Sequence, residues 1–335
     1  MMLDAYRVGS GAADATLADA TKILATRGRS FYWARRLLNQ RHAERATRLY
    51  RFCRHIDDLA DEAPSPELAA KALDVLSDAI LHRHAISPLV ADALALMAEC
   101  EIEPSIMLEL ICGVRSDLTL VRCADERSLL HYCYRVAGTV GIMMCHALDV
   151  KDRATLHHAI DLGIGMQLTN ICRDVAEDAT LGRRYLPATL VGDCEPSALA
   201  MPDQNLRPIV TQAVRTLLTK ADAYYDSGEH GLHFLPSGAQ AGILVAARLY
   251  RAIGVRLLRQ DGDYWTGRTV VPTTSKISLT LRALYDLRFD HSLAHNTSMT
   301  DTSRIGGHQR HDAFLHVPLA GLPHTVFSSD VDHGD

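Results

Sequence analysis

The sequence has few aromatic residues, no excess of positive charge and no long apolar run. Aromatic residues make up 6% of the 335 residues, and the net charge is −5 with a pI near 6.4. Because a protein that binds nucleic acid usually presents a basic face, this balance argues against a nucleic-acid partner. The longest weakly polar stretch, Val136 to Leu148, is shorter than the roughly 20 residues that a membrane span requires.

The eight cysteines form no Cys-x-x-Cys pair and have no regular spacing. Several of them, such as Cys112, Cys133 and Cys145, lie in apolar helical stretches, which favours reduced thiols in a cytoplasmic protein. The N-terminal residues have no basic region followed by an apolar run, so we expect no signal peptide. We therefore expect a cytoplasmic protein whose membrane contact, on the inner face of the cell membrane, is peripheral.

What the sequence does have is a repeated helical period. Apolar residues recur every three to four positions, and short Pro or Gly segments interrupt them. No alternating run is long enough for a strand of a large sheet, so we expect an all-α protein. The expected helices span 16–38, 43–62, 66–82, 88–100, 104–121, 125–148, 152–180, 205–228, 237–260 and 273–289.

The composition divides the chain into three parts: a flexible N-terminus (1–15), a single helical domain (16–290) and a tail (291–335). The tail has no apolar period and holds seven of the 17 histidines, so we expect it to be disordered. His291 and His295 have the helical spacing of a metal pair. Since no acidic or cysteine ligand surrounds them, we assign no metal site there.

Two groups of aspartates stand out, one at Asp57, Asp58 and Asp61 and one at Asp174 and Asp178. Aspartates four residues apart on a helix point the same way. Two carboxylates about 4 Å apart repel by roughly 4 kcal/mol at an effective dielectric near 20, so a cation between them is expected. Oxygen ligands suit Mg²⁺, with Mn²⁺ as a substitute, and Mg²⁺ usually completes its shell with substrate phosphates. The implied substrate is a phosphate or diphosphate.

Polar residues continue the second aspartate group along the same helical face, since Gln167 and Asn170 precede Asp174 by seven and four residues. Arginine forks match phosphate oxygens, so basic residues beside the aspartates favour diphosphate binding. The basic residues that flank the two groups are Arg54, His55, Arg173, Arg183 and Arg184. For Arg183 and Arg184, ordinary ion pairing on a helix surface is an equal alternative.

Two other kinds of protein gather acidic residues on helices. A four-helix di-iron protein needs paired Glu-x-x-His motifs, and this chain contains no Glu-x-x-His. A non-catalytic helical protein that binds diphosphate is the remaining alternative. A cheap test is whether Mg²⁺ with a diphosphate ligand raises the melting temperature, as ligand linkage requires of a protein that binds it.

Several segments together match a known family. They are Arg29-Ser30-Phe31, YRFCRHIDDLADE at 50–62, YCYRVAGTVG at 132–141, QLTNICRDVAEDA at 167–179, GRRYLP at 182–187 and AARLYRAIG at 246–254. In their order and spacing, from about residue 20 to 285, the chain resembles the squalene and phytoene synthase family of head-to-head prenyltransferases. The resemblance implies an all-α, single-domain class I isoprenoid synthase fold with a central cavity.

Carried over residue by residue, the resemblance implies roles for individual side chains. The implied metal ligands, which are also catalytic, are Asp57, Asp61, Asn170, Asp174 and Asp178. The residues implied to contact or order the substrate are Ser30, Phe31, Tyr50, Arg54, Gln167, Arg173, Tyr250 and Arg268. Arg54 and Tyr132 join the catalytic set, and Tyr132 lines the reaction cavity. Small residues at Val136, Ala137, Gly138 and Gly141 suit a prenyl channel, with close helix packing as the alternative.

The resemblance also implies the reaction. It favours Mg²⁺-dependent condensation of two geranylgeranyl diphosphates, through a cyclopropylcarbinyl diphosphate, to phytoene without NADPH, in carotenoid synthesis. The alternative is a squalene, dehydrosqualene or hydroxysqualene synthase that uses farnesyl diphosphate. A downstream desaturase is the expected protein partner. Two departures from the family pattern are Arg27-Gly28, where many members have His-Ser, and Arg135, which we expect to point away from the cavity.

Overall fold

The computed structural model describes residues 20–26, 28–150, 152–289 and 311–327. Within these ranges the regular structure is helical, and the only β-type pairing is an isolated bridge between Arg122 and Arg184. The all-α expectation is therefore confirmed. Of the helices in these ranges, none is long and apolar enough to cross a bilayer.

Four of the α-helices begin where the sequence supplies a capping side chain. The side chains of Asn39, Ser65, Ser87 and Asp125 each accept a hydrogen bond from a backbone N–H in the first turn of the helix that follows. The helices of the first half are α2 (Arg29–Arg35), α3 (Gln40–Asp61), α4 (Pro66–Leu81), α5 (Pro88–Cys100), α6 (Pro104–Ser116), α7 (Glu126–Cys133), the π-helical segment η1 (Tyr134–Gly138) and α8 (Thr139–Ala147). Those of the second half are α9 (Arg153–Thr180), α10 (Ala188–Val191), α11 (Pro196–Ala200), α12 (Leu206–His230), η2 (Gly231–Phe234), α13 (Ser237–Arg259), α14 (Thr273–Phe289) and η3 (Ala313–Leu319).

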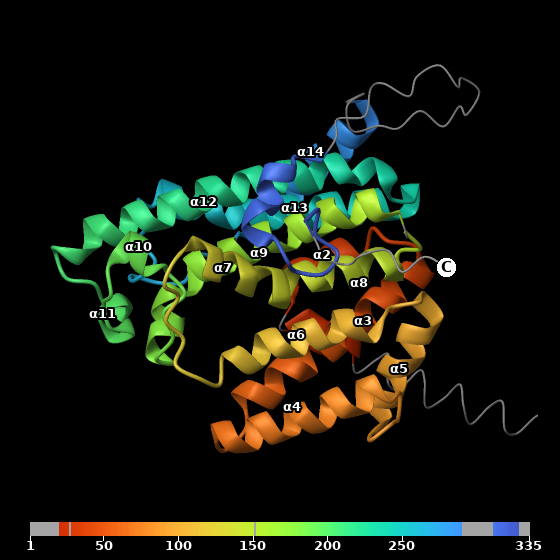
Figure 1. Ribbon diagram of the computed structural model, residues 1–335. Helices are drawn as coiled ribbons and strands as arrows, with labels where there is room; N and C mark the ends of the chain where they lie inside the picture. Colours follow the sequence, from red (N-terminus) through yellow and green to blue (C-terminus); the bar gives the residue numbers. More distant parts are fainter. Residues whose placement is uncertain (1–19, 27, 151, 290–310, 328–335) are drawn as a thin grey trace, which may run out of the picture.

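Helix α9 is at the centre of the fold. In Figure 1, helices α12, α13 and α14 lie on one side of it, and α3, α4, α5 and α6 lie on the other. It packs against α12, α8, η1 and α13. The fully buried Ile160, Ile164, Leu168 and Cys172 form an apolar stripe of four-residue period along it. This central position allows α9 to carry polar side chains on the face that the apolar stripe leaves free.

Two glycines allow α9 to approach the preceding helices closely. A Cβ atom on Gly141 of α8 would lie 2.2 Å from the carbonyl oxygen of Ala159. A Cβ atom on Gly163 of α9 would lie 2.3 Å from the carbonyl oxygen of Ala137. Both distances are far below van der Waals contact, so only glycine fits at these two crossings.

Two expected helix boundaries are wrong, and a third helix contains an irregular turn. The helix expected over 16–38 is divided, because residues 20–26 are helical and α2 starts again after Gly28. The helix expected over 104–121 ends at Ser116. The helix expected over 125–148 contains the π-helical turn η1, in which backbone hydrogen bonds join residues five apart in the sequence and not four. The apolar period does not indicate such a turn, because a π-helical turn shifts the apolar face of the helix by only one residue.

The expectation of a disordered tail is wrong for residues 311–327. This segment contains the short 3₁₀ helix η3 and packs against α7. Tyr224 on α12 donates a hydrogen bond to the carbonyl of Leu315, and Tyr134 on η1 donates one to the carbonyl of Pro323. The segment is therefore fixed by polar contacts with distant residues, which an apolar period does not reveal.

The other parts of the three-part division stay predictions. Residues 1–15 lie outside the described residues, and so do 291–310, with His291 and His295, and 328–335.

Candidate active site

Helices α3 and α9 face each other across a cavity of about 160 Å³ that is lined mainly by polar side chains. The aspartates among these side chains are Asp57, Asp61, Asp117, Asp174 and Asp178. The structure thus brings the two predicted groups together, although they are more than 100 residues apart in the sequence. We call this space the acidic pocket.

Two carboxylates of the acidic pocket, one on each facing helix, have raised pKa values. Burial, together with the neighbouring charge of Asp61, raises the pKa of Asp57 to about 7. Burial, together with the charge of Asp174, raises the pKa of Asp178 to about 7. Two carboxyl groups from different helices are therefore destabilised in their charged form, which a bound cation would reverse.

Asp174 differs from Asp57 and Asp178 because two arginines donate hydrogen bonds to it. Burial alone would raise its pKa, but hydrogen bonds from Arg173 and Arg268 outweigh burial and hold the pKa below the usual range. Arg173 Nε lies 2.7 Å from Oδ1 of Asp174, and Arg268 donates to both carboxylate oxygens at 2.8 and 3.1 Å. The two predicted arginines thus lie at the acidic pocket, with Asp174 as their shared partner.

Asn170 supplies a direct test of whether a cation fits. Its amide nitrogen donates to Gln167, 3.3 Å away, while its Oδ1 atom is buried and has no hydrogen-bond partner. Both side chains line the acidic pocket. An unpaired buried acceptor costs roughly 1–3 kcal/mol, and here it lies beside an all-oxygen set of carboxylates. Such donors match a hard divalent cation, so the residues fit the metal that the sequence implies.

Asp117 is a residue of the acidic pocket that the sequence did not indicate. It caps the C-terminal end of α6 and accepts hydrogen bonds from Tyr132 at 2.9 Å and Tyr185 at 2.6 Å. The two tyrosine rings stack, with centroids 4.7 Å apart. Tyr132 therefore lines the acidic pocket. No spacing rule marks Asp117, because it stands alone in its segment.

The two arginines of the GRRYLP segment have different surroundings. Arg183 lies in the acidic pocket and contacts Asp61 at 3.1 Å, which fits the diphosphate alternative. Arg184 is buried and donates to Asp193 and to the carbonyls of Cys123 and Leu186. The side chain of Arg184 therefore links the segment after α9 to Cys123, and it does not line the acidic pocket.

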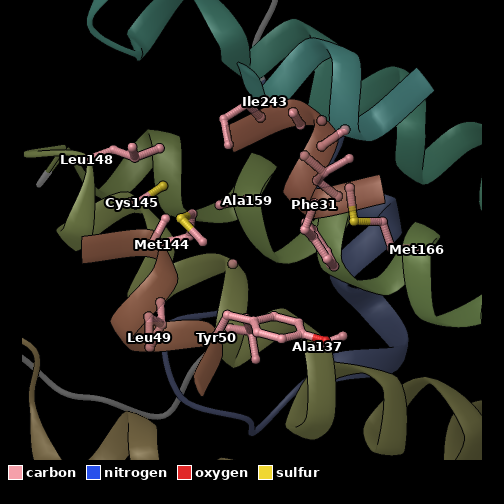
Figure 2. Close-up of a pocket in the computed structure, with 18 of the residues that line it drawn as sticks. Phe31, Leu49, Tyr50, Ala137, Met144, Cys145, Leu148, Ala159, Met166 and Ile243 are labelled. Carbon is pink, nitrogen blue, oxygen red and sulfur yellow. The ribbon is translucent and has the colours of Figure 1, made fainter. Parts of the chain in front are cut away.

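A second, apolar cavity of about 320 Å³ adjoins the acidic pocket, and Asp57, Gln167 and Asn170 line both. Figure 2 shows the apolar side chains that surround it. One face of α9 follows its whole length, through Thr155, His158, Ala159, Leu162, Gly163, Met166, Gln167 and Asn170. From Thr155 to Asn170 the helix rises about 22 Å, so the α9 residues that line this cavity extend over several helical turns, with Gln167 and Asn170 at the end next to the acidic pocket.

Most of the remaining predicted residues line this apolar cavity. Phe31, Tyr50 and Tyr250 do, and the Phe31 ring lies 6.1 Å from Tyr50 and 5.1 Å from Tyr250, between centroids. Ser30 is part of α2 but lines neither cavity, and Arg54 lines only the acidic pocket, where it pairs with Asp58.

The small-residue segment divides between the two interpretations offered for it. Val136, Ala137 and Gly141 line the apolar cavity. Gly138 is buried against Tyr134 and Ile160 and lines neither cavity, so helix packing explains it. Arg135 pairs with Glu109 at 3.1 Å and lines neither cavity, as expected.

The raised pKa of Asp57 gives a pH-dependent prediction for metal-free protein. The folded carboxyl has a pKa of about 7 against 3.8 in the unfolded chain, so only the folded state binds this proton between those values. The contribution of Asp57 to stability is therefore present at low pH and is lost as the pH rises toward 7. In Asp57→Asn the side chain has no carboxyl group that can ionise, so the stability of the variant does not fall for this reason. We expect the melting temperature of the variant to be close to that of wild type near pH 4, to exceed it already at pH 6, and to exceed it most at pH 8, measured with EDTA present. Equal melting temperatures at pH 8 would contradict the buried-charge interpretation.

Comparison with known proteins agrees with this geometry. The squalene/phytoene synthase family model matches residues 24–275. A phytoene synthase from Pseudescherichia vulneris is 32% identical over 276 residues, which cover 79% of this chain and 89% of that protein. A 15-cis-phytoene synthase from Paracoccus sp. (strain N81106) is 34% identical over 275 residues, which cover 78% and 88%.

Solved structures share the fold. A dehydrosqualene synthase in complex with a ligand superposes with a TM-score of 0.74 at 24% identity, covering 83% of this chain and 98% of that one. Squalene synthase HpnC from Alicyclobacillus acidocaldarius superposes with a TM-score of 0.58 at 20% identity, covering 69% and 94%. The class I isoprenoid synthase fold is therefore confirmed. With facing aspartates, an adjoining apolar cavity and this similarity over most of its length, the chain belongs to the squalene/phytoene synthase family.

Proposed function

We propose that this prenyltransferase joins two molecules of geranylgeranyl diphosphate head to head and releases phytoene and two diphosphates. The observation that carries this proposal is the apolar cavity that follows α9 over several helical turns and adjoins the acidic pocket. Such a shape holds a substrate with one charged end and one long apolar end. The curated relatives with 32–34% identity are named as phytoene synthases, which supports the same product.

The length of the cavity favours a twenty-carbon substrate. An extended chain of single-bonded atoms advances about 1.2 Å per bond, as the polypeptide backbone does. The sixteen bonds from the ester oxygen to the end of a geranylgeranyl chain then span about 19 Å, and the twelve of a farnesyl chain about 14 Å. A geranylgeranyl chain that starts at Asn170 therefore reaches His158, about 18 Å along α9, and a farnesyl chain ends about 4 Å short of it.

The acidic pocket would hold the metal and the diphosphate. The proposed ligands are Asp57 and Asp61 on α3 and Asn170, Asp174 and Asp178 on α9, all of which line the pocket. Mg²⁺ bound there would neutralise negative charge on the departing diphosphate and so favour cleavage of the allylic C–O bond.

Arginines at the rim of the acidic pocket would bind the diphosphate oxygens as the bond breaks. Arg54 and Arg183 line the pocket, and Arg268 reaches it from the segment after α13. Their present partners are Asp58, Asp61 and Asp174. Each guanidinium has donors left for phosphate, and Arg173 beside Asp174 adds a further positive charge.

The apolar cavity would protect the carbocation and direct its reaction. Water is excluded by a wall of aliphatic and aromatic side chains, and the rings of Phe31, Tyr50 and Tyr250 offer negative π faces to a cation. One allylic cation is attacked by the double bond of the second substrate to give the cyclopropylcarbinyl diphosphate. Loss of its diphosphate, rearrangement and loss of one proton give phytoene.

A product analysis tests this proposal. Purified protein with Mg²⁺ is incubated separately with fifteen- and twenty-carbon prenyl diphosphates, each with and without NADPH, and the hydrocarbon is identified by mass spectrometry. We expect phytoene from the twenty-carbon substrate, with no effect of NADPH. Squalene or dehydrosqualene from the fifteen-carbon substrate, with no phytoene, would favour the squalene-type alternative. Binding without turnover would favour the non-catalytic alternative.

We further propose peripheral membrane contact through α14. Four of its large apolar side chains are exposed at four-residue intervals: Ile277 (48%), Leu281 (64%), Tyr285 (63%) and Phe289 (62%). They form one stripe, and the exposed Arg282 and Arg288 lie beside it. An apolar stripe with basic neighbours suits the interface of an anionic bilayer, into which a forty-carbon hydrocarbon would also partition.

This proposal predicts dependence on lipid. Leu281→Glu should reduce sedimentation with anionic vesicles and leave the melting temperature unchanged, because the side chain is exposed. Turnover of wild type should rise with vesicles or detergent, since product release into an apolar phase relieves a slow step. Met201→Glu, at an apolar site that is 67% exposed but outside α14, is the matched control and should bind vesicles normally. Equal vesicle binding by both variants would contradict the assignment to α14.

A further inference from the structure

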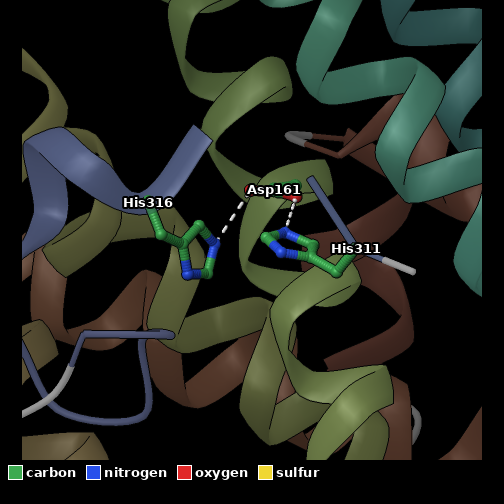
Figure 3. A group of neighbouring side chains, drawn as sticks. All are labelled: Asp161, His311 and His316. Carbon is green, nitrogen blue, oxygen red and sulfur yellow. Dashed lines mark hydrogen bonds and ion pairs between the residues drawn. The ribbon is translucent and has the colours of Figure 1, made fainter. Parts of the chain in front are cut away.

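The docked segment 311–327 is held by a buried cluster of one carboxylate and two histidines. Figure 3 shows Asp161 on α9 between His311 and His316. The Nε2 atoms of His311 and His316 lie 2.6 and 3.0 Å from the two carboxylate oxygens of Asp161. The side chains of Asp161, His311 and His316 are 0%, 7% and 0% exposed. We call these three side chains the Asp161 cluster.

By residue type the three side chains could bind a metal. The hydrogen bonds of His316, however, place a hydrogen on the nitrogen that would bind it. The backbone N–H of Val326 donates to Nδ1 of His316 at 3.1 Å, so this nitrogen carries no hydrogen. Nε2 of neutral His316 must then carry the hydrogen and donate it to Asp161. A nitrogen that carries a hydrogen cannot bind a metal. The Asp161 cluster is therefore a hydrogen-bonded anchor for the segment.

The Asp161 cluster is connected to the apolar cavity through Ser227 and His158. The hydroxyl of Ser227 on α12 donates to Asp161 at 2.6 Å, which leaves its oxygen to accept from Nδ1 of His158, 2.9 Å away. The ring of His158 also lies against that of His311, with centroids 5.2 Å apart. Since His158 lines the apolar cavity, its ring separates the cavity from the docked segment.

His158 has little freedom at this position. A Cβ atom on Gly231 would lie 2.4 Å from the Cβ atom of His158, so η2 packs directly against it. The ring of Phe234 stacks on the other side, with centroids 6.1 Å apart. Along α9, His158 lies twelve residues before Asn170, or about 18 Å from the acidic pocket. A chain of four isoprene units attached there would end at this ring.

We propose that His158 is the end wall of the prenyl cavity and that the docked segment 311–327, anchored by Asp161, holds this wall in place. His158 is then a residue that determines the longest prenyl chain accepted, and Asp161 and His316 are positioning residues that act through it. This inference rests on the proposed function, because it identifies which substrate length the same cavity excludes.

The experiment compares substrates of twenty and twenty-five carbons. His158→Ala removes the wall and keeps the anchor, whereas His316→Ala keeps the wall and releases the segment. We expect both variants to raise kcat/KM for geranylfarnesyl diphosphate relative to geranylgeranyl diphosphate at least tenfold, mainly through a lower KM for the longer substrate, because a hydrophobic pocket discriminates by 10–200-fold per added group. Hydrogen exchange of residues 313–326 should increase in His316→Ala only.

Phe314→Ala is the matched control, since Phe314 lies in the same segment and is 83% exposed. It should change neither selectivity nor hydrogen exchange. An unchanged length preference in His158→Ala, or in His316→Ala once exchange shows the segment released, would overturn the proposal, as would one zinc ion per purified chain. If His316→Ala does not fold, His158→Ala decides the question alone.

If wild type turns over no prenyl diphosphate, the proposed function fails. The end wall is then tested by whether the twenty-five-carbon diphosphate with Mg²⁺ raises the melting temperature of His158→Ala but not of wild type.

Discussion

Asp57→Asn will lose turnover by at least roughly 100-fold while the protein stays folded, because electrostatic groups that act on the leaving charge contribute about 10²–10³ in rate. Asp57 lines both cavities and faces Asp174 and Asp178 across the acidic pocket. Asparagine keeps the shape and removes the charge. Steady-state kinetics with the twenty-carbon diphosphate and Mg²⁺ measure the loss, and Asp174→Asn should behave alike.

The control for this result is a neutralised aspartate outside the acidic pocket. Asp78→Asn on α4 changes a side chain that is 60% exposed and whose partner is His82. It should retain wild-type kinetics. If Asp57→Asn retained wild-type kinetics too, Asp57 would have no role in binding the metal. A loss in both variants would instead indicate a general effect of charge.

Gly163→Ala will lower the melting temperature by several degrees, although helix propensity alone predicts the opposite sign. Alanine in a helix is favoured over glycine by about 1 kcal/mol. Here, however, the added Cβ atom would lie 2.3 Å from the carbonyl oxygen of Ala137, and backbone cannot move aside as a flexible side chain can. Such overpacking costs about 1–3 kcal/mol or more. Turnover should fall as well, because Ala137 and Gly163 both line the apolar cavity. Thermal unfolding and kinetics measure the two effects.

Gly238→Ala tests the same substitution where there is space. Its Cβ atom would lie 3.3 Å from the side-chain amide of Asn39, a slightly tight contact with a side chain that a shift of a few tenths of an ångström relieves. This variant should be as stable as wild type or slightly more so. Unchanged stability of Gly163→Ala beside it would mean that α9 and η1 can move apart without cost.

The sequence predicts the parts of the site that lie on one helix. Asp57 with Asp61, and Gln167 and Asn170 with Asp174, are spaced by helical turns, so their common orientation follows from local geometry. That the two groups face each other is a tertiary fact. The family resemblance implies it only by assigning both groups to one set of metal ligands.

What the sequence could not predict depends on single residues with distant partners. Asp117 has no neighbour of its own kind, and its role follows only from its hydrogen bonds with Tyr132 and Tyr185. His311 and His316 stand in a segment without apolar period, and Asp161 had no feature that distinguished it. Each of these polar contacts joins parts of the chain that no local rule relates.

The buried carboxylate of Asp161 also has a consequence for how this chain folds. Its histidine partners follow 150 and 155 residues later in the sequence. During folding, a core that formed around α9 without residues 311–327 would enclose a carboxylate stabilised only by Ser227, at a large desolvation cost. Final closure of α12 over α9 should therefore wait for the segment, which makes the last step of folding slow and of high contact order. Chains in which residues 311–327 cannot dock would then accumulate in a partly folded form that proteases cleave.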